Sequence, residues 1–120
     1  MLRQARRTLG ATAPGTDVDL RLGAAGRLPF DDDLFDVTMS VNTVVFWPVL
    51  AAGLAEMARV ARPGSVVMLA WHGGTSPSRI QRRLLLDHDT LTDVAVEMGA
   101  HFANVDHKRL RQSELLIASC

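Results

Sequence analysis

Two apolar segments separated by a helical pattern constrain the fold of this chain more than any other feature. Residues 35–41 and 65–71 are runs rich in apolar and β-branched side chains, which is typical of strands in the interior of a sheet. Between them, Leu50 and Leu54 recur at helical spacing until the Pro-Gly pair at 63–64 ends the pattern. A strand, a helix and a strand in this order predict a right-handed parallel unit, and therefore an α/β fold.

The segments on either side of this unit predict shorter elements. Charged and apolar residues alternate from Asp17 to Leu22, which is the pattern of a half-buried strand. Ser76 and Pro77 suit the start of a helix, and Thr90 suits the cap of a further helix that Gly99 ends. The other predicted elements are a helix in 1–9, a turn at Pro14-Gly15, and strands in 102–107 and 114–118.

Composition limits the partners and the setting of the chain. The 120 residues fit one domain, and 13 Lys and Arg balance 13 Asp and Glu, so no net charge attracts nucleic acid or an anionic membrane. The uncharged stretch 37–55 is long enough to span a bilayer, but its polar residues and Pro48 favour a strand, a loop and a helix. Cys120 is the single cysteine, so no disulfide forms within the chain and we expect a cytoplasmic protein.

Two sequence blocks carry a resemblance to a known family. The first runs from Leu28 to Val37 and reads LPFDDDLFDV, and the second runs from Glu56 to Gly64 and reads EMARVARPG. At this separation they resemble the class I S-adenosylmethionine-dependent methyltransferases called type 11. The resemblance continues in weaker form on both sides, so it covers nearly the whole chain and implies a Rossmann-like α/β fold.

The family's sheet contains more than this chain provides. The resemblance implies seven strands, with a first strand and a glycine-rich loop that cradle the methionine part of S-adenosylmethionine, and an acidic residue after the second strand that binds the ribose. Both features would precede Met1, and no glycine-rich loop joins a strand to a helix in this sequence. We therefore expect residues 1–120 to form the C-terminal part of a methyltransferase domain, whose sheet lacks its first two strands and the glycine-rich loop.

The resemblance implies five cofactor-binding candidates. Ala24 and Ala25 would lie beside the adenine, although many relatives carry at the position of Ala24 an aspartate that accepts a hydrogen bond from the adenine amino group. Ser40, Val41 and Asn42 end a central strand and would face the reactive methyl group, at the edge where open parallel sheets bind ligands. The alternative is that Ser40 and Asn42 hydrogen-bond the backbone of their own loop.

Other side chains are weaker candidates for chemistry. His72 follows a predicted core strand and is a candidate base, whereas a histidine in a loop usually meets only water. Phe46 and Trp47 either wall a substrate pocket or, as we expect, join the core. We expect no metal site, because the histidines lack ligand spacing and the three adjacent carboxylates at 31–33 suit a solvated turn.

The resemblance implies an enzyme that transfers a methyl group from S-adenosylmethionine to a small-molecule acceptor, by holding that group in line with a nucleophile. The alternative is a catalytically inactive remnant or gene fragment that acts at most as an interaction module. A nicotinamide-dependent oxidoreductase is disfavoured, because the chain has neither a G-x-G-x-x-G motif nor a tyrosine.

Strand order and charge give the expected partners. In the family's order, the absent strands sit between the first strand here and the rest of the sheet, so we expect self-association through open sheet edges. The basic helical face of Arg79, Arg82 and Arg83 is interpreted as solvated surface rather than a phosphate site. We accordingly expect no nucleic-acid and no membrane partner.

Overall fold

The computed structural model describes residues 2–12, 15 and 17–120, so Met1 of the predicted first helix and Pro14 of the predicted turn lie outside it. None of the helices in these ranges is both long and apolar enough to cross a membrane. The helices and strands, in chain order, are α1 (Leu2–Thr12), β1 (Phe35–Val41), η1 (Val44–Phe46), α2 (Leu50–Val60), β2 (Ala61–His72), η2 (Gln81–Arg83), α3 (His88–His101), β3 (Ala103–Arg109) and β4 (Ser113–Ser119).

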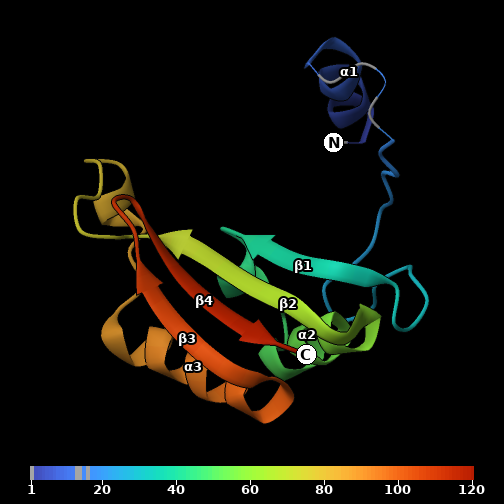
Figure 1. Ribbon diagram of the computed structural model, residues 1–120. Coiled ribbons are helices and arrows are strands. Elements are labelled where there is room, and N and C mark those ends of the chain that lie inside the picture. Colours follow the sequence, from blue (N-terminus) through green and yellow to red (C-terminus); the bar gives the residue numbers. More distant parts are fainter. Residues whose placement is uncertain (1, 13–14, 16) are drawn as a thin grey trace.

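The strands form one sheet in the order β1-β2-β4-β3 (Figure 1). β1 and β2 are parallel and are joined through α2, which confirms the predicted strand-helix-strand unit and the α/β fold. β4 is antiparallel to both β2 and β3, so the last two strands form a hairpin. The carboxyl ends of β1, β2 and β3 therefore lie at the same end of the sheet, which we call the carboxyl edge.

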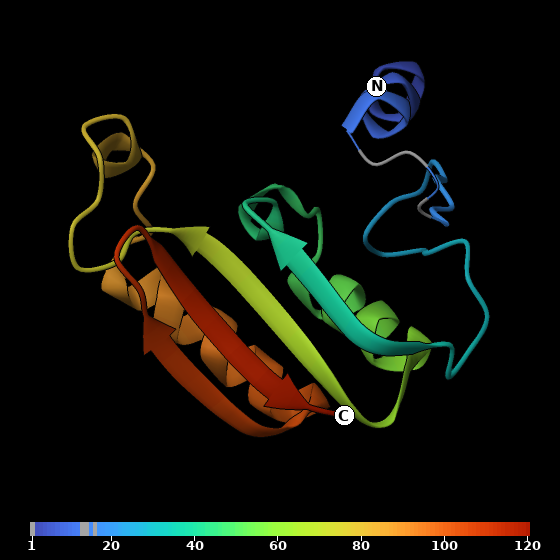
Figure 2. The ribbon, with the colours of Figure 1, turned by 45° about the horizontal axis from the view of Figure 1, so that its top comes forward.

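α2 and α3 cover one face of the sheet (Figures 1 and 2). From Ser65 to Trp71 of β2 every second residue is buried, which is the period expected when a strand has one covered face. The hydrophobic core between sheet and helices also contains Leu54, Met57, Val94, Met98, Leu116 and Ala118.

The opposite face of the sheet is apolar but uncovered. Met39 of β1 is 57% exposed on this face, and it lies in register with Met68 of β2, which in turn pairs with Ile117 of β4. Val37 and Val41 extend the same row along β1. α1 lies away from the sheet in both views, so it leaves this face open (Figures 1 and 2).

The two family blocks meet in space through Glu56 and Arg59 of α2. Glu56 Oε2 accepts a hydrogen bond from the Leu28 amide at 2.7 Å, and its carboxylate binds Arg59 through both oxygens at 2.8 and 2.9 Å. Arg59 donates in turn to the carbonyl oxygen of Phe30 and to Asp32, both at 2.8 Å. This network, which we call the Glu56 clamp, holds the segment before β1 against α2.

The predicted strand from Asp17 to Leu22 is wrong. Residues 17–23 have no regular secondary structure, and the Leu22 side chain is 80% exposed. A segment with an alternating pattern forms a strand only when a neighbouring strand hydrogen-bonds its backbone N–H and C=O groups. None of the described strands pairs with this segment.

Where the sequence predicted a helix from Pro77, the structure has only the single turn η2, so the predicted helix cap at Ser76 is wrong. The Ser76 amide donates instead to the carbonyl oxygen of Arg111 at 2.8 Å, so the chain is bound to the β3–β4 turn rather than coiled on itself. In α3 the cap is Asp87, which accepts a hydrogen bond from the Thr90 amide at 2.7 Å. Thr90 is therefore inside the helix, and Gly99 does not end it.

Candidate functional site

A groove at the carboxyl end of β1 brings together three of the five cofactor candidates, Ala25, Ser40 and Val41. Its volume is about 390 Å³. The groove lies between the end of β1 and α2, at the edge where open parallel sheets bind ligands. The other residues that line it are Leu28, Thr38, Met39, Thr43, Trp47, Gly53 and Met57.

The hydroxyl groups of the groove differ in their hydrogen bonds. The Ser40 and Thr43 hydroxyls share a hydrogen bond of 2.7 Å. The Thr38 Oγ1 atom is buried and has no hydrogen-bond partner, although a buried hydroxyl without one costs about 1 to 3 kcal/mol. Thr38 therefore lines the groove, but its hydroxyl oxygen is closed off from solvent and is not exposed to a ligand. Its position two residues before Ser40, on the same side of the strand, is the sequence signal that could have identified it.

Ala24 and Asn42 lie beside the groove but do not line it. The Ala24 carbonyl oxygen accepts a hydrogen bond from the Arg27 amide at 3.0 Å, which closes a turn. Asn42 has a φ of 57°, in the left-handed region that asparagine tolerates, and its amide donates to the Ala70 carbonyl oxygen at 2.9 Å. Both residues set the course of the backbone next to the groove.

The two aromatic residues after this loop have different fates. Trp47 packs against the core and lines the groove, and its ring lies so close to Gly53 that a Cβ atom there would clash with it. For Trp47 the core assignment is confirmed. Phe46 is 76% exposed, so its assignment to the core is wrong: it ends the short turn η1 and extends past Trp71, with 6.0 Å between ring centroids.

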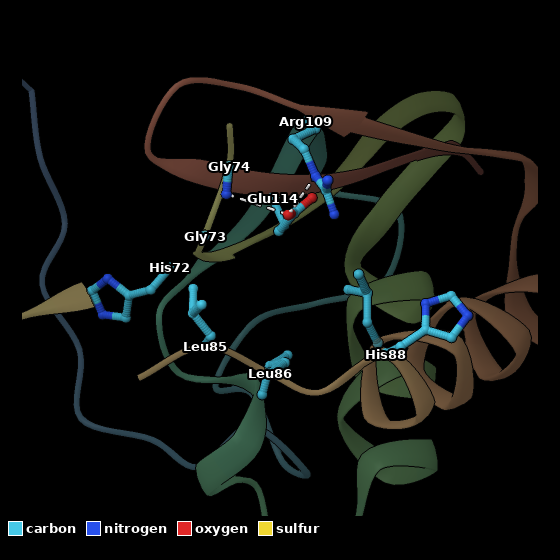
Figure 3. A pocket seen from close by; sticks show the side chains of 9 residues that line it. His72, Gly73, Gly74, Leu85, Leu86, His88, Arg109 and Glu114 are labelled. Carbon is cyan, nitrogen blue, oxygen red and sulfur yellow. Dashed lines mark hydrogen bonds and ion pairs between the residues drawn. The ribbon is translucent and has the colours of Figure 1, made fainter. Parts of the chain in front are cut away.

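A second, smaller hollow of about 190 Å³ lies at the carboxyl end of β2 and contains His72 in its lining. Arg109 and Glu114 lie opposite Leu85 and Leu86 across it, and the His72 ring points away from both charged groups (Figure 3). The remaining lining residues are Gly73, Gly74, His88 and Leu91.

Glu114 is the best-connected charged residue of this hollow, and sequence reasoning missed it. Its Oε1 atom accepts hydrogen bonds from the Arg109 Nε at 2.9 Å and the Gly74 amide at 3.2 Å, and its Oε2 lies 2.6 Å from His107 Nε2. Burial by itself raises the pKa of Glu114, but the hydrogen bonds from His107 and Gly74 and the charge of Arg109 outweigh burial, so its pKa is lowered. Glu114 is therefore an ionised group that fixes the Gly73-Gly74 loop to the hairpin.

The described residues contain no group of three or more His, Cys, Asp or Glu side chains placed to hold a metal ion. The carboxylates at 31–33 form an exposed turn, as expected, in which Asp33 has a φ of 52° and Asp32 pairs with Arg59. The acidic run thus serves the Glu56 clamp.

The lining of the first groove fits the adenosine part of S-adenosylmethionine. Apolar side chains offer surface for a flat base, and the exposed hydroxyl pair of Ser40 and Thr43 offers polar atoms for its edge. No charged side chain lines the groove, so nothing there pairs with the carboxylate and ammonium of the methionine part. Fold and groove together define an α/β domain with a groove at the carboxyl edge of its sheet, where open α/β sheets bind their ligands.

Comparison with known proteins gives the family. Residues 1–69 match the family described as methyltransferase domain, and the chain belongs to this family. The resemblance seen in the two sequence blocks is thereby confirmed, and with it a class I, S-adenosylmethionine-dependent methyltransferase domain with a Rossmann-like fold.

Curated relatives share short stretches with the chain. Phthiotriol/phenolphthiotriol dimycocerosates methyltransferase of Mycobacterium tuberculosis is 45% identical over 47 residues, which cover 39% of this chain and 17% of that protein. Demethylmenaquinone methyltransferase of Mycolicibacterium gilvum is 59% identical over 46 residues, which cover 35% and 18%. Each match thus spans less than a fifth of the relative.

Solved structures share the fold across nearly the whole chain. A putative S-adenosylmethionine-dependent methyltransferase of Methanococcus maripaludis superposes with a TM-score of 0.74 at 15% identity, covering 98% of this chain and 61% of that one. The PH0226 protein of Pyrococcus horikoshii gives 0.72 at 16% identity, covering 99% and 68%.

Proposed function

We propose that this domain takes part in S-adenosylmethionine-dependent methyl transfer to a small-molecule acceptor. The observation that carries the proposal is the groove in which Ala25, Ser40 and Val41 meet at the carboxyl end of β1. Membership of the methyltransferase family supports it.

Each residue of the groove would have a role in cofactor binding that follows from its position. Ala25 and Val41 offer apolar surface to the adenosine, and Ser40 and Thr43 offer hydroxyls. The turns at Ala24 and Asn42 hold the backbone on either side. When bound, the cofactor supplies an electrophilic methyl group. The protein's contribution is then to orient that group and to exclude water.

The acceptor would occupy the second hollow, beside the end of β2. Leu85, Leu86 and Leu91 line it and suit an acceptor with an apolar body, and His72 is the candidate base at its rim. The named relatives make phthiotriol dimycocerosates and demethylmenaquinone the first acceptors to test.

The methionine part of the cofactor needs a further polypeptide segment. Residues 1–120 contain no glycine-rich loop between a strand and a helix, and such a loop is the usual cradle for this kind of cofactor. A segment outside residues 1–120 would supply it. The alternative function, an inactive interaction module, is favoured by the uncovered apolar face of the sheet, which suits a partner surface.

Isothermal titration of the full chain with S-adenosylmethionine and S-adenosylhomocysteine tests the proposal, with a nicotinamide dinucleotide as the control ligand. We expect stoichiometric binding of both sulfur compounds and none of the dinucleotide. Ala25→Trp fills the groove and should abolish binding, whereas Ala100→Trp, on the exposed side of α3, should not. A folded chain that gives no binding heat would refute cofactor binding and leave the interaction module.

A further inference from the structure

The charges of the chain balance overall but not locally. Among the described residues, several arginines are paired with carboxylates, including Arg59 with Glu56 and Arg62 with Asp36. Five cations near the carboxyl edge have no ion pair with any carboxylate that the structure describes, namely Arg79, Arg82, Arg83, Lys108 and Arg111.

Tertiary structure gathers these cations at one end of the molecule. The loop that follows β2 is bound to the β3–β4 turn, because the Thr75 amide donates to the Leu110 carbonyl oxygen and the Ser76 amide to that of Arg111, both at 2.8 Å. Figure 1 shows the loop and the turn projecting together beyond the strands. We call residues 73–86 and 108–114 the basic end: they carry six Lys and Arg and a single carboxylate, that of Glu114.

Exposed aliphatic side chains interleave with these cations. Ile80 is 75% exposed, and Leu84, Leu85 and Leu110 are also exposed. Arg79 and Arg83 flank Ile80 around an open hollow of about 450 Å³. Cations beside protruding aliphatic side chains suit a surface that is anionic outside and apolar just below, which is the profile of a lipid bilayer.

We propose that the basic end docks the protein on an anionic lipid bilayer, with Arg79, Arg82 and Arg83 on the headgroups and Ile80 and Leu84 in the interface. Nucleic acid is the other polyanion to weigh, but the basic end contains no aromatic residue on which a base could stack. Exposed leucines and isoleucine gain nothing against a hydrated phosphate backbone, whereas they gain free energy on entering the membrane interface.

This inference differs from the absence of a membrane partner expected from the sequence. That expectation rested on net charge, which is zero because the carboxylates lie elsewhere. It also does not depend on methyl transfer, although the basic end adjoins the second hollow through the Gly73-Gly74 loop, so docking would place that hollow near the bilayer.

Vesicle co-sedimentation of the full chain tests the proposal without any activity measurement. We expect binding to phosphatidylcholine vesicles that contain phosphatidylserine, none to phosphatidylcholine alone, and weakening with added salt. Equal binding to both vesicles, or no binding to either, would overturn the proposal.

Two sets of variants locate the docking surface. The triple variant Arg79→Gln, Arg82→Gln and Arg83→Gln should weaken vesicle binding on the order of 100-fold. Each cation near an anionic surface raises the binding affinity by about tenfold or less. The matched control replaces Arg3, Arg6 and Arg7 of α1 by Gln and should have a much smaller effect. An equal loss in the control would overturn the assignment to the basic end.

Ile80→Ser with Leu84→Ser separates a bilayer from a nucleic-acid partner. We expect this variant to lose vesicle affinity while its circular dichroism spectrum remains that of the parent chain. A variant that keeps full vesicle affinity, or a parent chain that binds an oligonucleotide more tightly than the anionic vesicles, would refute the lipid docking.

Discussion

Glu56 and Arg59 show at the scale of single residues why the two family blocks occur together. The bonds from Arg59 and then from the Leu28 amide lower the pKa of Glu56 from 4.5 to about 2, and Arg59 has a raised pKa for the reciprocal reason. A group whose pKa is lower in the folded state stabilises the fold above its unfolded pKa, and this contribution disappears as the pH falls through the folded value.

We therefore expect Glu56→Gln to lower the free energy of unfolding at pH 7 by about 1 to 3 kcal/mol, since charge-assisted hydrogen bonds to a half-buried group are lost. The difference between the variant and the parent should shrink as the pH falls from about 4.5 to about 2. Urea unfolding followed by circular dichroism at several pH values measures both effects.

Asp36→Asn is the matched control for this prediction. It breaks an ion pair with Arg62 in which the Asp36 side chain is 81% exposed, so its effect should stay below about 1 kcal/mol. A Glu56→Gln effect no larger than that of the control would mean that the clamp does not stabilise the fold.

At the scale of elements, the ends of helices depended on contacts that local pattern did not contain. Thr90 and Gly99 were plausible ends for α3, yet the helix extends from His88 to His101 and its cap is Asp87. The helix continues through Gly99 because its Val94 and Met98 side chains pack in the core against the sheet, and this packing outweighs the small cost of one helical glycine.

Asp87→Ala should cost about 0.5 to 2 kcal/mol of stability, because the Thr90 amide loses its acceptor at the start of α3. The hydrogen bonds from Thr90 lower the pKa of Asp87, so the contribution is present above the ordinary pKa of 3.8 and declines below it. Thermal unfolding at pH 7 measures the change. Asp93→Ala, exposed within the same helix, is the control, and an equal loss there would exclude the cap as the cause.

At the scale of the whole molecule, one face and one edge of the sheet lack a covering layer. β1 is an edge strand, and from Val37 to Val41 it has no charge and no proline, the features that usually prevent edges from pairing. Its row of Val37, Met39 and Val41 also lies on the uncovered face. Both features predict self-association.

Met39→Lys places a charge in the middle of that row and should shift the protein toward monomer, as measured by sedimentation velocity at several concentrations. Val96→Lys is the matched control, since Val96 is equally apolar and is exposed on α3. A parent chain that sediments as a 13.1 kDa monomer throughout would contradict the prediction.

The site was only partly readable from the sequence. Ser40 and Val41 were candidates because the resemblance points to the end of a strand whose apolar pattern was clear, and Ala25 because it lies shortly before the first family block. Glu114 was missed because its partners, Gly74 and His107, come from separate segments that only the hairpin brings together.

Local periodicity and contiguous motif residues were enough to predict the parallel strand-helix-strand unit, the final hairpin and the family. Tertiary structure alone decided that residues 17–23 are not a strand, that residues 76–80 are not a helix, and that cations scattered along a neutral chain gather at one end. The physical reason is shared: backbone pairing and electrostatic fields depend on neighbours in space, and those neighbours lie tens of residues away along the chain.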